Sequence, residues 1–124
     1  MADENDGPPC VRAALWSDPS DSDADMARGV HGSPRGGDCV TFGPDVTERF
    51  CARNGLALVV RSHQVVGHGY KVMHGGRLVT VFSARNYGGT LGNDAALLLI
   101  AEDDDGALRV RPKRLFHLVS AAGV

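Results

Sequence analysis

The chain has 124 residues and a mass of 13.1 kDa, of which 43% are hydrophobic, so it can form one modest core and is too short for a multidomain enzyme. Its 13 Lys and Arg residues against 15 Asp and Glu residues give a net charge of -2, too balanced to drive non-specific binding to nucleic acid or an anionic membrane. The sequence contains neither an apolar run of membrane-spanning length nor a basic N-terminal signal. We expect a cytoplasmic or nuclear protein without nucleic-acid or membrane partners.

The N-terminal quarter is predicted to be irregular. Residues 17–37 are rich in Asp, Ser, Gly and Pro and nearly lack apolar side chains, which is typical of a long surface loop. Cys10, Cys39 and Cys51 form an odd set without Cys-x-x-Cys spacing. The sequence therefore predicts reduced thiols rather than a disulfide framework or a zinc ribbon.

Regular structure is predicted from about residue 40 onward. Gly43-Pro44-Asp45 is typical of a helix start and Asn54-Gly55 of a helix end, so we expect a helix over about 44–54. Three apolar residues share one face of this helix: Val46, Phe50 and Cys51. The continuous apolar run 56–60 then predicts a strand buried on both faces.

The second half is predicted to be largely β-structure. Strand-like runs lie at 70–73, 77–82, 95–101 and 108–111. The Gly-rich connection His74-Gly75-Gly76 is typical of a hairpin, and the acidic stretch 102–106 is typical of a turn between the last two strands.

One histidine stands out by its position. His63 directly follows the predicted strand 56–60, and the ends of central strands hold ligands or catalytic groups at the edge of a cleft. Arg61 lies two residues earlier, so the pair could present a metal-binding imidazole and a charge near one pocket. A strand end capped by polar groups explains the pattern equally well, and the residues alone leave both interpretations open.

Five blocks in register across about 15–118 resemble the C-terminal half of the PPP family of metal-dependent serine/threonine protein phosphatases. The blocks are 15–19, 42–46, 61–66, 69–70 and 79–87. Blocks 42–46 and 74–77 are most similar to the protein phosphatase 5 subtype. The resemblance implies an α+β fold, the β-rich C-terminal half of a metallophosphatase β-sandwich flanked by helices. It would comprise an acidic lead-in at 1–14, a partial phosphatase domain at 15–118 and a tail at 119–124.

The resemblance also implies roles for individual residues. His63 is similar to the last metal ligand of the family, and Tyr87 to the tyrosine that overhangs the phosphate, although a loop aromatic packed on the hairpin is the structural alternative. The family places a phosphate-binding arginine in an Arg-Gly-Val motif before Phe42. Arg28 keeps those letters but lies further upstream, whereas Arg35 lies near the family's distance from Phe42, so we predict Arg35.

The departures from the family are equally informative. Arg85 replaces a proline, Gly88 a common cysteine and His68 a usual acid. Because proline would fix the loop before Tyr87, we expect Arg85 and Gly88 to make that loop more mobile and more basic. The three upstream family motifs that supply most metal ligands are absent from the sequence. We therefore expect a C-terminal piece of a catalytic domain. Two divalent metal ions, Mn, Fe or Zn, would bind the complete domain and would not be retained by this chain alone.

Two hypotheses of function follow. In the first, the chain is part of an enzyme that hydrolyses phosphoserine and phosphothreonine with a metal-activated water. Its partners would then be phosphoproteins, the missing N-terminal half or regulatory subunits. In the alternative, the chain is a catalytically inactive phosphatase remnant that acts as a β-rich protein-binding module.

Overall fold

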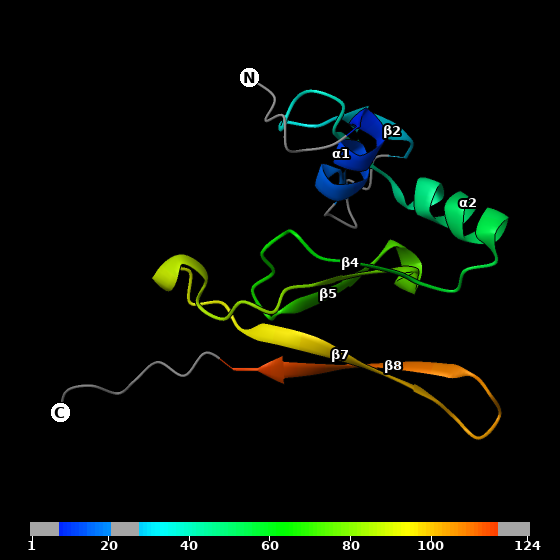
Figure 1. Ribbon diagram of the computed structural model, residues 1–124, viewed down its shortest axis with the longest axis vertical. Coiled ribbons are helices and arrows are strands. Elements are labelled where there is room, and N and C mark those ends of the chain that lie inside the picture. The colour runs from blue at the N-terminus through cyan, green and yellow to red at the C-terminus, as the bar shows by residue number, and fades with distance from the viewer. Residues whose placement is uncertain (1–7, 21–27, 117–124) are drawn as a thin grey trace. The chain divides into compact units, whose positions relative to one another are not determined.

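The computed structural model describes residues 8–20 and 28–116, which belong to two compact units (Figure 1). Unit 1 comprises the chain up to Val59 together with Val72–Leu78, and unit 2 comprises Val60–Lys71 and the chain from Val79 onward. No helix in the described ranges is long and apolar enough to cross a membrane. The predicted tail 119–124 and half of the predicted lead-in lie outside the described residues, and the predicted domain boundaries stay predictions.

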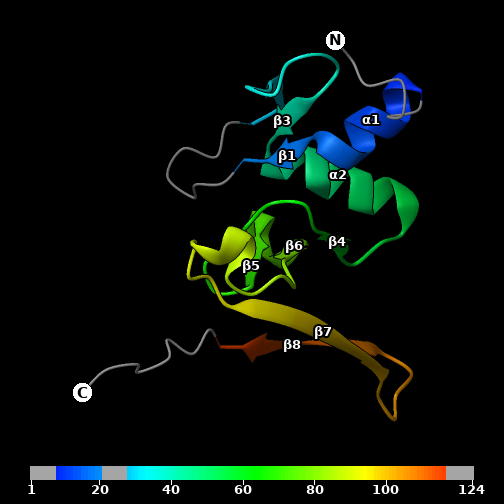
Figure 2. The ribbon, with the colours of Figure 1, turned by 60° about the vertical axis from the view of Figure 1, so that its left-hand side comes forward.

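Unit 1 begins with a helix that the composition does not predict, α1 (Pro9–Trp16). A proline at its start and an Ala-Ala-Leu run favour this helix locally. The predicted loop 17–37 contains two short strands, β1 (Asp18–Pro19) and β2 (Val30–Gly32). Both strands pair with β3 (Val40–Phe42), β1 in parallel and β2 antiparallel, and Figure 2 shows β1 beside β3. Residues 21–27 of this predicted loop lie outside the described residues. For the rest, a uniform loop is wrong, because a neighbouring strand can hold even a polar stretch in register.

Helix α2 (Pro44–Asn54) has the predicted boundaries. Gly55 ends it in the left-handed conformation with φ of 62°, where glycine carries no steric penalty. The predicted apolar face is only partly correct: Cys51 is fully buried, but Phe50 is 51% exposed. The other buried side chains of α2 are Asp45 and Thr47, which pair with hydrogen-bonding groups elsewhere in unit 1 and so can be buried.

The strand predicted at 56–60 forms later and is shorter, as β4 (Val59–Arg61). Burial on both faces is wrong, because Leu56 and Val60 are 42% and 45% exposed. The N–H groups of Gly55 and Leu56 both donate to the Cys51 carbonyl, so these residues close the helix before the strand starts.

The predicted hairpin is confirmed. Strands β5 (Tyr70–Met73) and β6 (Leu78–Val81) are neighbours in a sheet of order β4-β6-β5, joined by the turn His74–Gly76. Leu78 and Thr80 of β6 are among the most completely buried side chains of the described chain, at 1% and 0% exposed.

Strands β7 (Ala95–Glu102) and β8 (Leu108–Leu115) form an antiparallel pair that runs from Ala95 opposite Leu115 to Glu102 opposite Leu108 (Figure 1). The predicted turn lies between them, and β8 continues four residues beyond the predicted end at Arg111. The described fold, with mixed sheets and few helices, confirms the predicted α+β class.

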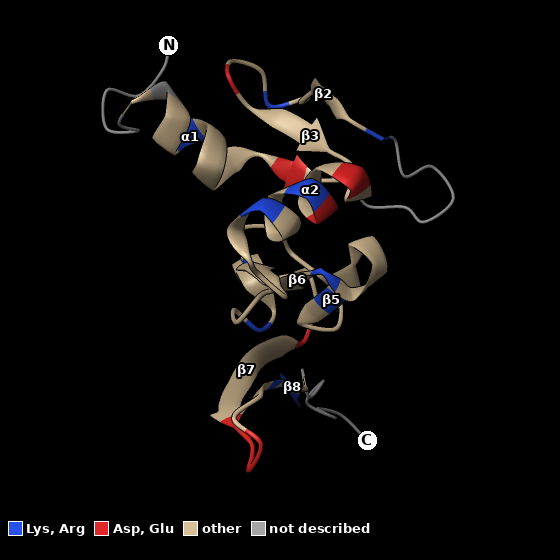
Figure 3. Cartoon of the chain, turned by 90° about the vertical axis from the view of Figure 1, so that its right-hand side faces the viewer, with Lys and Arg blue, Asp and Glu red and all other residues tan. Residues whose placement is uncertain are grey.

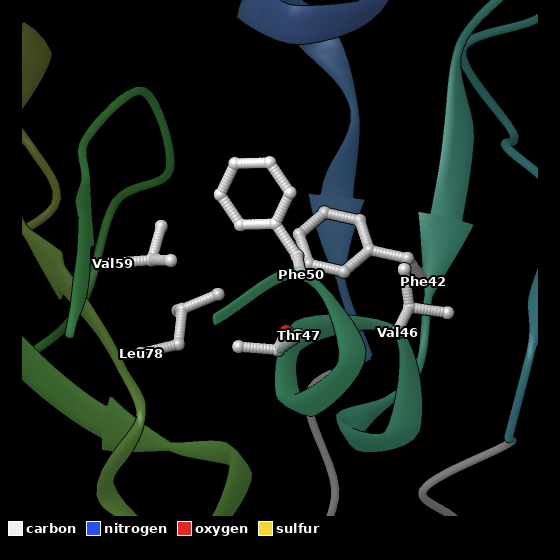
Figure 4. Close-up of a pocket in the computed structure, with 6 residues that line it drawn as sticks. All are labelled: Phe42, Val46, Thr47, Phe50, Val59 and Leu78. Carbon is white, nitrogen blue, oxygen red and sulfur yellow. The ribbon is translucent and has the colours of Figure 1, made fainter. Parts of the chain in front are cut away.

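Unit 1 also contains an apolar pocket of about 240 Å³ beside α2, which Figure 4 shows from within. Its walls come from β3, α2, β4 and β6, with the Phe42 and Phe50 rings among the side chains that border the space. The half-exposed Phe50 is therefore one wall of an open pocket rather than part of the closed core. The lining residues are Phe42, Val46, Thr47, Phe50, Val59 and Leu78.

Candidate active site

His63 lies just beyond the end of β4 in unit 2, as predicted from its position, and its side chain is exposed. Its φ of 83° is in the left-handed region, which costs a non-glycine residue about 1–2 kcal/mol. Next to it, the Arg61 guanidinium donates to the Gln64 side-chain oxygen at 2.6 Å. The strand end therefore combines a hydrogen-bonded arginine with a conformationally strained histidine.

The stretch that carries His63 is joined to the stretch that carries Tyr87 at the start of β7. The Asp94 N–H donates to the Gly67 carbonyl at 3.0 Å, and the Phe82 N–H donates to the Gly69 carbonyl at 2.7 Å. Gly69 has φ of 80°, and a Cβ atom there would lie 2.3 Å from the carbonyl carbon of Ala95. Glycine is therefore required at position 69, and this close backbone approach joins the two stretches within unit 2.

Tyr87 is 54% exposed, and its ring packs edge-on against Phe82 with the ring centroids 5.4 Å apart. Its N–H donates to the Asn93 side-chain oxygen at 2.9 Å. The Asn93 amide nitrogen in turn donates to the Ala84 and Asp94 carbonyls. Asn93, 4% exposed, therefore fixes the shape of the loop that presents Tyr87. The sequence analysis missed this role, because an asparagine in a Gly-rich loop gives no local sign of burial.

Arg35 belongs to unit 1, whereas His63 and Tyr87 belong to unit 2. Arg35 lies in the loop between β2 and β3, where its Nε donates to Asp18 Oδ2 at 2.8 Å and its guanidinium lies 5.9 Å from the centre of the Trp16 ring. With Arg12, Trp16 and Cys39 it lines a pocket of about 310 Å³. A guanidinium that binds a carboxylate in this way is also suited to phosphate oxygens.

Arg28, the alternative arginine, lies much closer to Phe42 in space than in sequence. The β2–β3 register places Val30 opposite Phe42, and the Gly43 N–H donates to the Gly29 carbonyl at 2.8 Å. The intervening residues form the far end of the hairpin. The number of residues between an arginine and Phe42, which favours Arg35, therefore does not measure their distance in space. The choice of Arg35 over Arg28 stays a prediction.

Asp45 anchors the Arg28-Gly29 segment to the start of α2. Its carboxylate accepts a hydrogen bond from the Gly29 N–H at 2.7 Å and is paired with Arg49 at 2.9 Å. The Gly29 N–H is the main cause that lowers the pKa of Asp45, with the Arg49 charge adding to it. The carboxylate thus stays ionised at neutral pH and holds the segment in place.

His74 is the second histidine that structural placement distinguishes, and sequence reasoning treated it as part of a turn. It is 3% exposed, with Nδ1 at 2.8 Å from Thr47 Oγ1 and Nε2 at 3.2 Å from the Ser20 carbonyl oxygen. Because a carbonyl oxygen only accepts hydrogen bonds, this contact assigns the hydrogen to Nε2, which donates a hydrogen bond to the Ser20 carbonyl. Both ring nitrogens thus join separate segments of unit 1, so the histidine has a structural role there.

The described residues do not by themselves complete a metal centre. Within residues 8–20 and 28–116 no group of three or more His, Cys, Asp or Glu side chains is arranged to hold a metal ion. The exposed imidazole of His63 is suited to act as one ligand of a transition metal.

Residues 2–67, more than half of the chain, match the family model described as calcineurin-like phosphoesterase. The chain belongs to the calcineurin-like phosphoesterase family. Members of this metallophosphoesterase family depend on divalent metal ions. The match confirms the predicted relationship to metal-dependent phosphatases.

The relatives place the chain more narrowly among calcineurin-like phosphoesterases. Serine/threonine-protein phosphatase T of Trypanosoma brucei brucei is 46% identical over 91 residues, 73% of this chain and 18% of the relative. Human serine/threonine-protein phosphatase 5 is 44% identical over 115 residues, 93% of this chain and 20% of the relative. The resemblance to the protein phosphatase 5 subtype is thereby confirmed. The chain spans about a fifth of the length of these curated relatives.

A solved structure shows the same likeness. The serine/threonine phosphatase from Saccharomyces cerevisiae with similarity to human phosphatase PP5 superposes with a TM-score of 0.66 at 31% identity. The superposition covers 92% of this chain and 36% of that chain. The α+β fold of the described residues is therefore that of a phosphatase of the protein phosphatase 5 type.

Proposed function

We propose that this chain supplies the C-terminal part of the catalytic domain of a serine/threonine protein phosphatase. In the complete domain, two divalent metal ions, Mn, Fe or Zn, would supply the activated water that hydrolyses phosphoserine and phosphothreonine. The family match and the names of the relatives support the phosphatase class. The structural observation that carries the proposal is the exposed imidazole of His63 just beyond the end of β4, on a left-handed backbone that is costly for a non-glycine residue.

Three residues have roles in this proposal. The imidazole of His63 is a metal ligand at the end of β4. The Arg35 guanidinium binds phosphate oxygens, which would compete with the carboxylate of Asp18 for the same donors. Tyr87 lies over the phosphate, with its ring packed edge-on against Phe82. These roles orient the substrate and hold its charge.

The substrates would be phosphoproteins, and further partners would be the polypeptide that supplies the remaining metal ligands and regulatory subunits. His63 is the one residue of this chain to which we assign a metal-binding role. A single imidazole cannot hold two close cations, so we expect the chain alone neither to retain the metals nor to turn over phosphoester. Elemental analysis of purified residues 1–124, with an aryl phosphate assay in manganese, checks this. Stoichiometric metal and turnover would contradict it.

The His63 assignment is tested in the complete domain by His63→Ala. Loss of a direct ligand should lower both bound metal and phosphatase rate by about 100-fold or more. His31→Ala, which removes an exposed imidazole from β2, is the matched control and should retain metal. Unchanged metal content in the His63 variant would exclude a ligand role.

The phosphate-binding arginine is tested by comparing Arg35→Ala with Arg28→Ala. Arg35→Ala should raise KM and lower kcat, with Arg28→Ala nearly unchanged, since a lost phosphate contact weakens both ground-state and transition-state binding. The reverse result would assign the role to Arg28, whose neighbour Gly29 is hydrogen-bonded to Gly43 directly after Phe42. Genomic DNA upstream of Met1 separates enzyme from remnant: an open frame with the three absent motifs supports the enzyme, and in-frame stops support the remnant.

A further inference from the structure

Three separate stretches of unit 2 bring basic side chains to the end of β8, around Arg114 and Phe116. Arg114 bonds to the Asp94 carboxylate, which is 13% exposed, and its Nη2 lies 3.2 Å from Nδ1 of His68. The Arg114 guanidinium also lies 4.7 Å from the centre of the Phe116 ring. Arg85 donates to the Phe116 carbonyl at 3.3 Å. We refer to His68, Arg85 and Arg114 as the basic cluster.

The basic cluster has an excess of positive charge. Asp94 neutralises one of its two guanidinium groups. The next acids along β7 lie at Glu102 and in the turn 103–105, at the far end of the hairpin (Figure 3). Eight residues of extended strand separate Asp94 from Glu102, which is about 27 Å. That distance is well beyond the Debye length of about 8 Å at physiological salt, so these acids do not cancel the field of the cluster.

Arg85 contributes little to the fold. Its side chain is exposed, and its described hydrogen bond is long and reaches a carbonyl close to the end of the described chain. The loop around it is shaped instead by Asn93 and Asn86, whose side chains bond to backbone groups of the same loop. The Arg85 guanidinium has five N–H donors, and its backbone is held by other residues. Its remaining donors are therefore available to a ligand.

The position of Arg85 indicates which ligand this would be. It lies two residues before Tyr87, in the loop that, under the proposed function, faces the phosphorylated residue. A guanidinium there would meet side chains that flank the phosphorylated residue of a bound substrate. Carboxylates are the complementary groups, because guanidinium binds them in bidentate pairs. The two substitutions noted in the sequence, Arg85 for proline and His68 for an acid, both add basic character to this region.

We propose that the basic cluster selects substrates with acidic residues next to the phosphorylated serine or threonine, with Arg85 as the main contact. This inference rests on the proposed function for the placement of the substrate. The inference concerns a preference among phosphoprotein substrates. Peptide binding can be measured without the metal centre and without hydrolysis.

Binding of dye-labelled peptides to the 124-residue chain, followed by fluorescence anisotropy, tests the proposal. The probes are a phosphoserine peptide with Asp and Glu on both sides, the same peptide with Ala flanks, and the same peptide with Lys flanks. We expect the acidic peptide to bind about 2- to 5-fold more tightly than the Ala peptide at low salt, which corresponds to one exposed charge pair with Arg85. The difference should shrink as salt is raised.

Variants assign the preference to Arg85. Arg85→Gln should bring the affinities for the acidic and Ala peptides to within about 1.5-fold of each other, and Arg85→Glu should shift the preference toward the Lys peptide. Arg109→Gln removes an equal charge from the opposite face of β8 and should retain the wild-type preference. Equal binding of the acidic and Ala peptides, or a preference that Arg85→Gln leaves unchanged, would overturn the inference.

A second measurement separates this inference from the proposed function. In the complete domain, kcat/KM is measured for the acidic and Ala phosphopeptides. Hydrolysis of both at equal rates would support the phosphatase and overturn the preference. Arg85-dependent binding of the acidic peptide to the chain, without hydrolysis by the complete domain, would support the basic cluster as an acidic-peptide site and contradict the proposed phosphatase activity.

Discussion

The two ends of strand β7 have nearly the same apolar character and very different surroundings. Ala95 and Ala96, at its start, are 1% and 0% exposed, whereas Leu99 and Ile100, near its end, are 48% and 60% exposed. At the start, the Phe82 carbonyl and the Ser83 hydroxyl bond to Ala96, and the close approach of Gly69 covers the strand. Toward the end, its described strand partner is β8 alone. Burial in this strand thus follows from what packs against it rather than from composition.

The buried start of β7 is also where the candidate-site stretches meet. In the stretch that carries His63, Gly67 and Gly69 contact the start of β7. The loop that carries Tyr87 leads into β7 at Asn93 and Asp94. Rigid backbone contacts therefore support the candidate site within unit 2, while the exposed end of the hairpin is far from it along the strand. Substitutions at the two ends should have correspondingly different effects.

The largest difference is expected between Ala96→Glu and Ala101→Glu. The first introduces a carboxylate at a fully buried position and should cost about 3 kcal/mol or more of unfolding free energy. The second lies on the same strand, opposite Arg109, and should change stability by about 0.5 kcal/mol or less in either direction. Urea titration of the two variants measures the difference. Similar losses at both positions would mean that the end of β7 is also covered.

Next in size is Gly69→Ala, with Gly67→Ala as its control. An alanine Cβ at position 69 would overlap the Ala95 backbone, and φ is positive there, so we expect a loss of about 3 kcal/mol. A Cβ at position 67 meets no atom within 4 Å, so the control should stay within about 0.5 kcal/mol. Thermal unfolding checks both. A tolerated alanine at 69 would show that the two stretches are not held together there.

A smaller effect is expected from Asn93→Ala, which leaves the Ala84 and Asp94 carbonyls and the Tyr87 N–H without their side-chain partner. Loss of these buried contacts should cost about 1–3 kcal/mol and speed hydrogen exchange of the Tyr87 amide. Asn54→Ala, which removes one exposed side-chain bond at the end of α2, is the control and should cost less. Unaltered exchange at Tyr87 in the Asn93 variant would contradict this account of the loop.

The smallest effect is expected at the turn between β7 and β8. The Arg109 side chain and then the Ala107 N–H lower the pKa of Asp103 below its ordinary value of 3.8. The fold thus favours the ionised carboxylate of Asp103. Its contribution to the free energy of unfolding is present above pH 3.8, the ordinary pKa, and is lost as the pH falls through the lower pKa of the folded state. NMR titration of the Ala107 amide should report this step, and Asp103→Asn should abolish it.

The sequence predicts well those features that depend on local chemistry. The α2 boundaries follow from a proline near its start and a left-handed Gly55 at its end, and the β5–β6 hairpin follows from its Gly-rich turn. Family blocks then supply His63, Arg35 and Tyr87 as candidate site residues, which stay predictions.

Features that depend on distant contacts could not be predicted in this way. The burial of His74 requires Thr47 and Ser20 to reach both ring nitrogens, and these residues lie 27 and 54 positions away along the chain. The exposure of Leu56 and Val60 depends on how α2 ends, which an apolar run does not reveal. The basic cluster likewise assembles from positions 68, 85 and 114, whose proximity is a property of the fold.

The β2–β3 hairpin has a consequence for how this family can change over evolution. Its register keeps Gly29 and Gly43 hydrogen-bonded whatever the number of residues at the far end of the hairpin. Closing a loop twice as long costs only about 0.6 kcal/mol of entropy, so insertions and deletions at the tip are nearly neutral for stability. Alignments through this region should therefore be anchored on paired strands rather than on residue counts, since length can vary here while the two anchoring glycines stay neighbours.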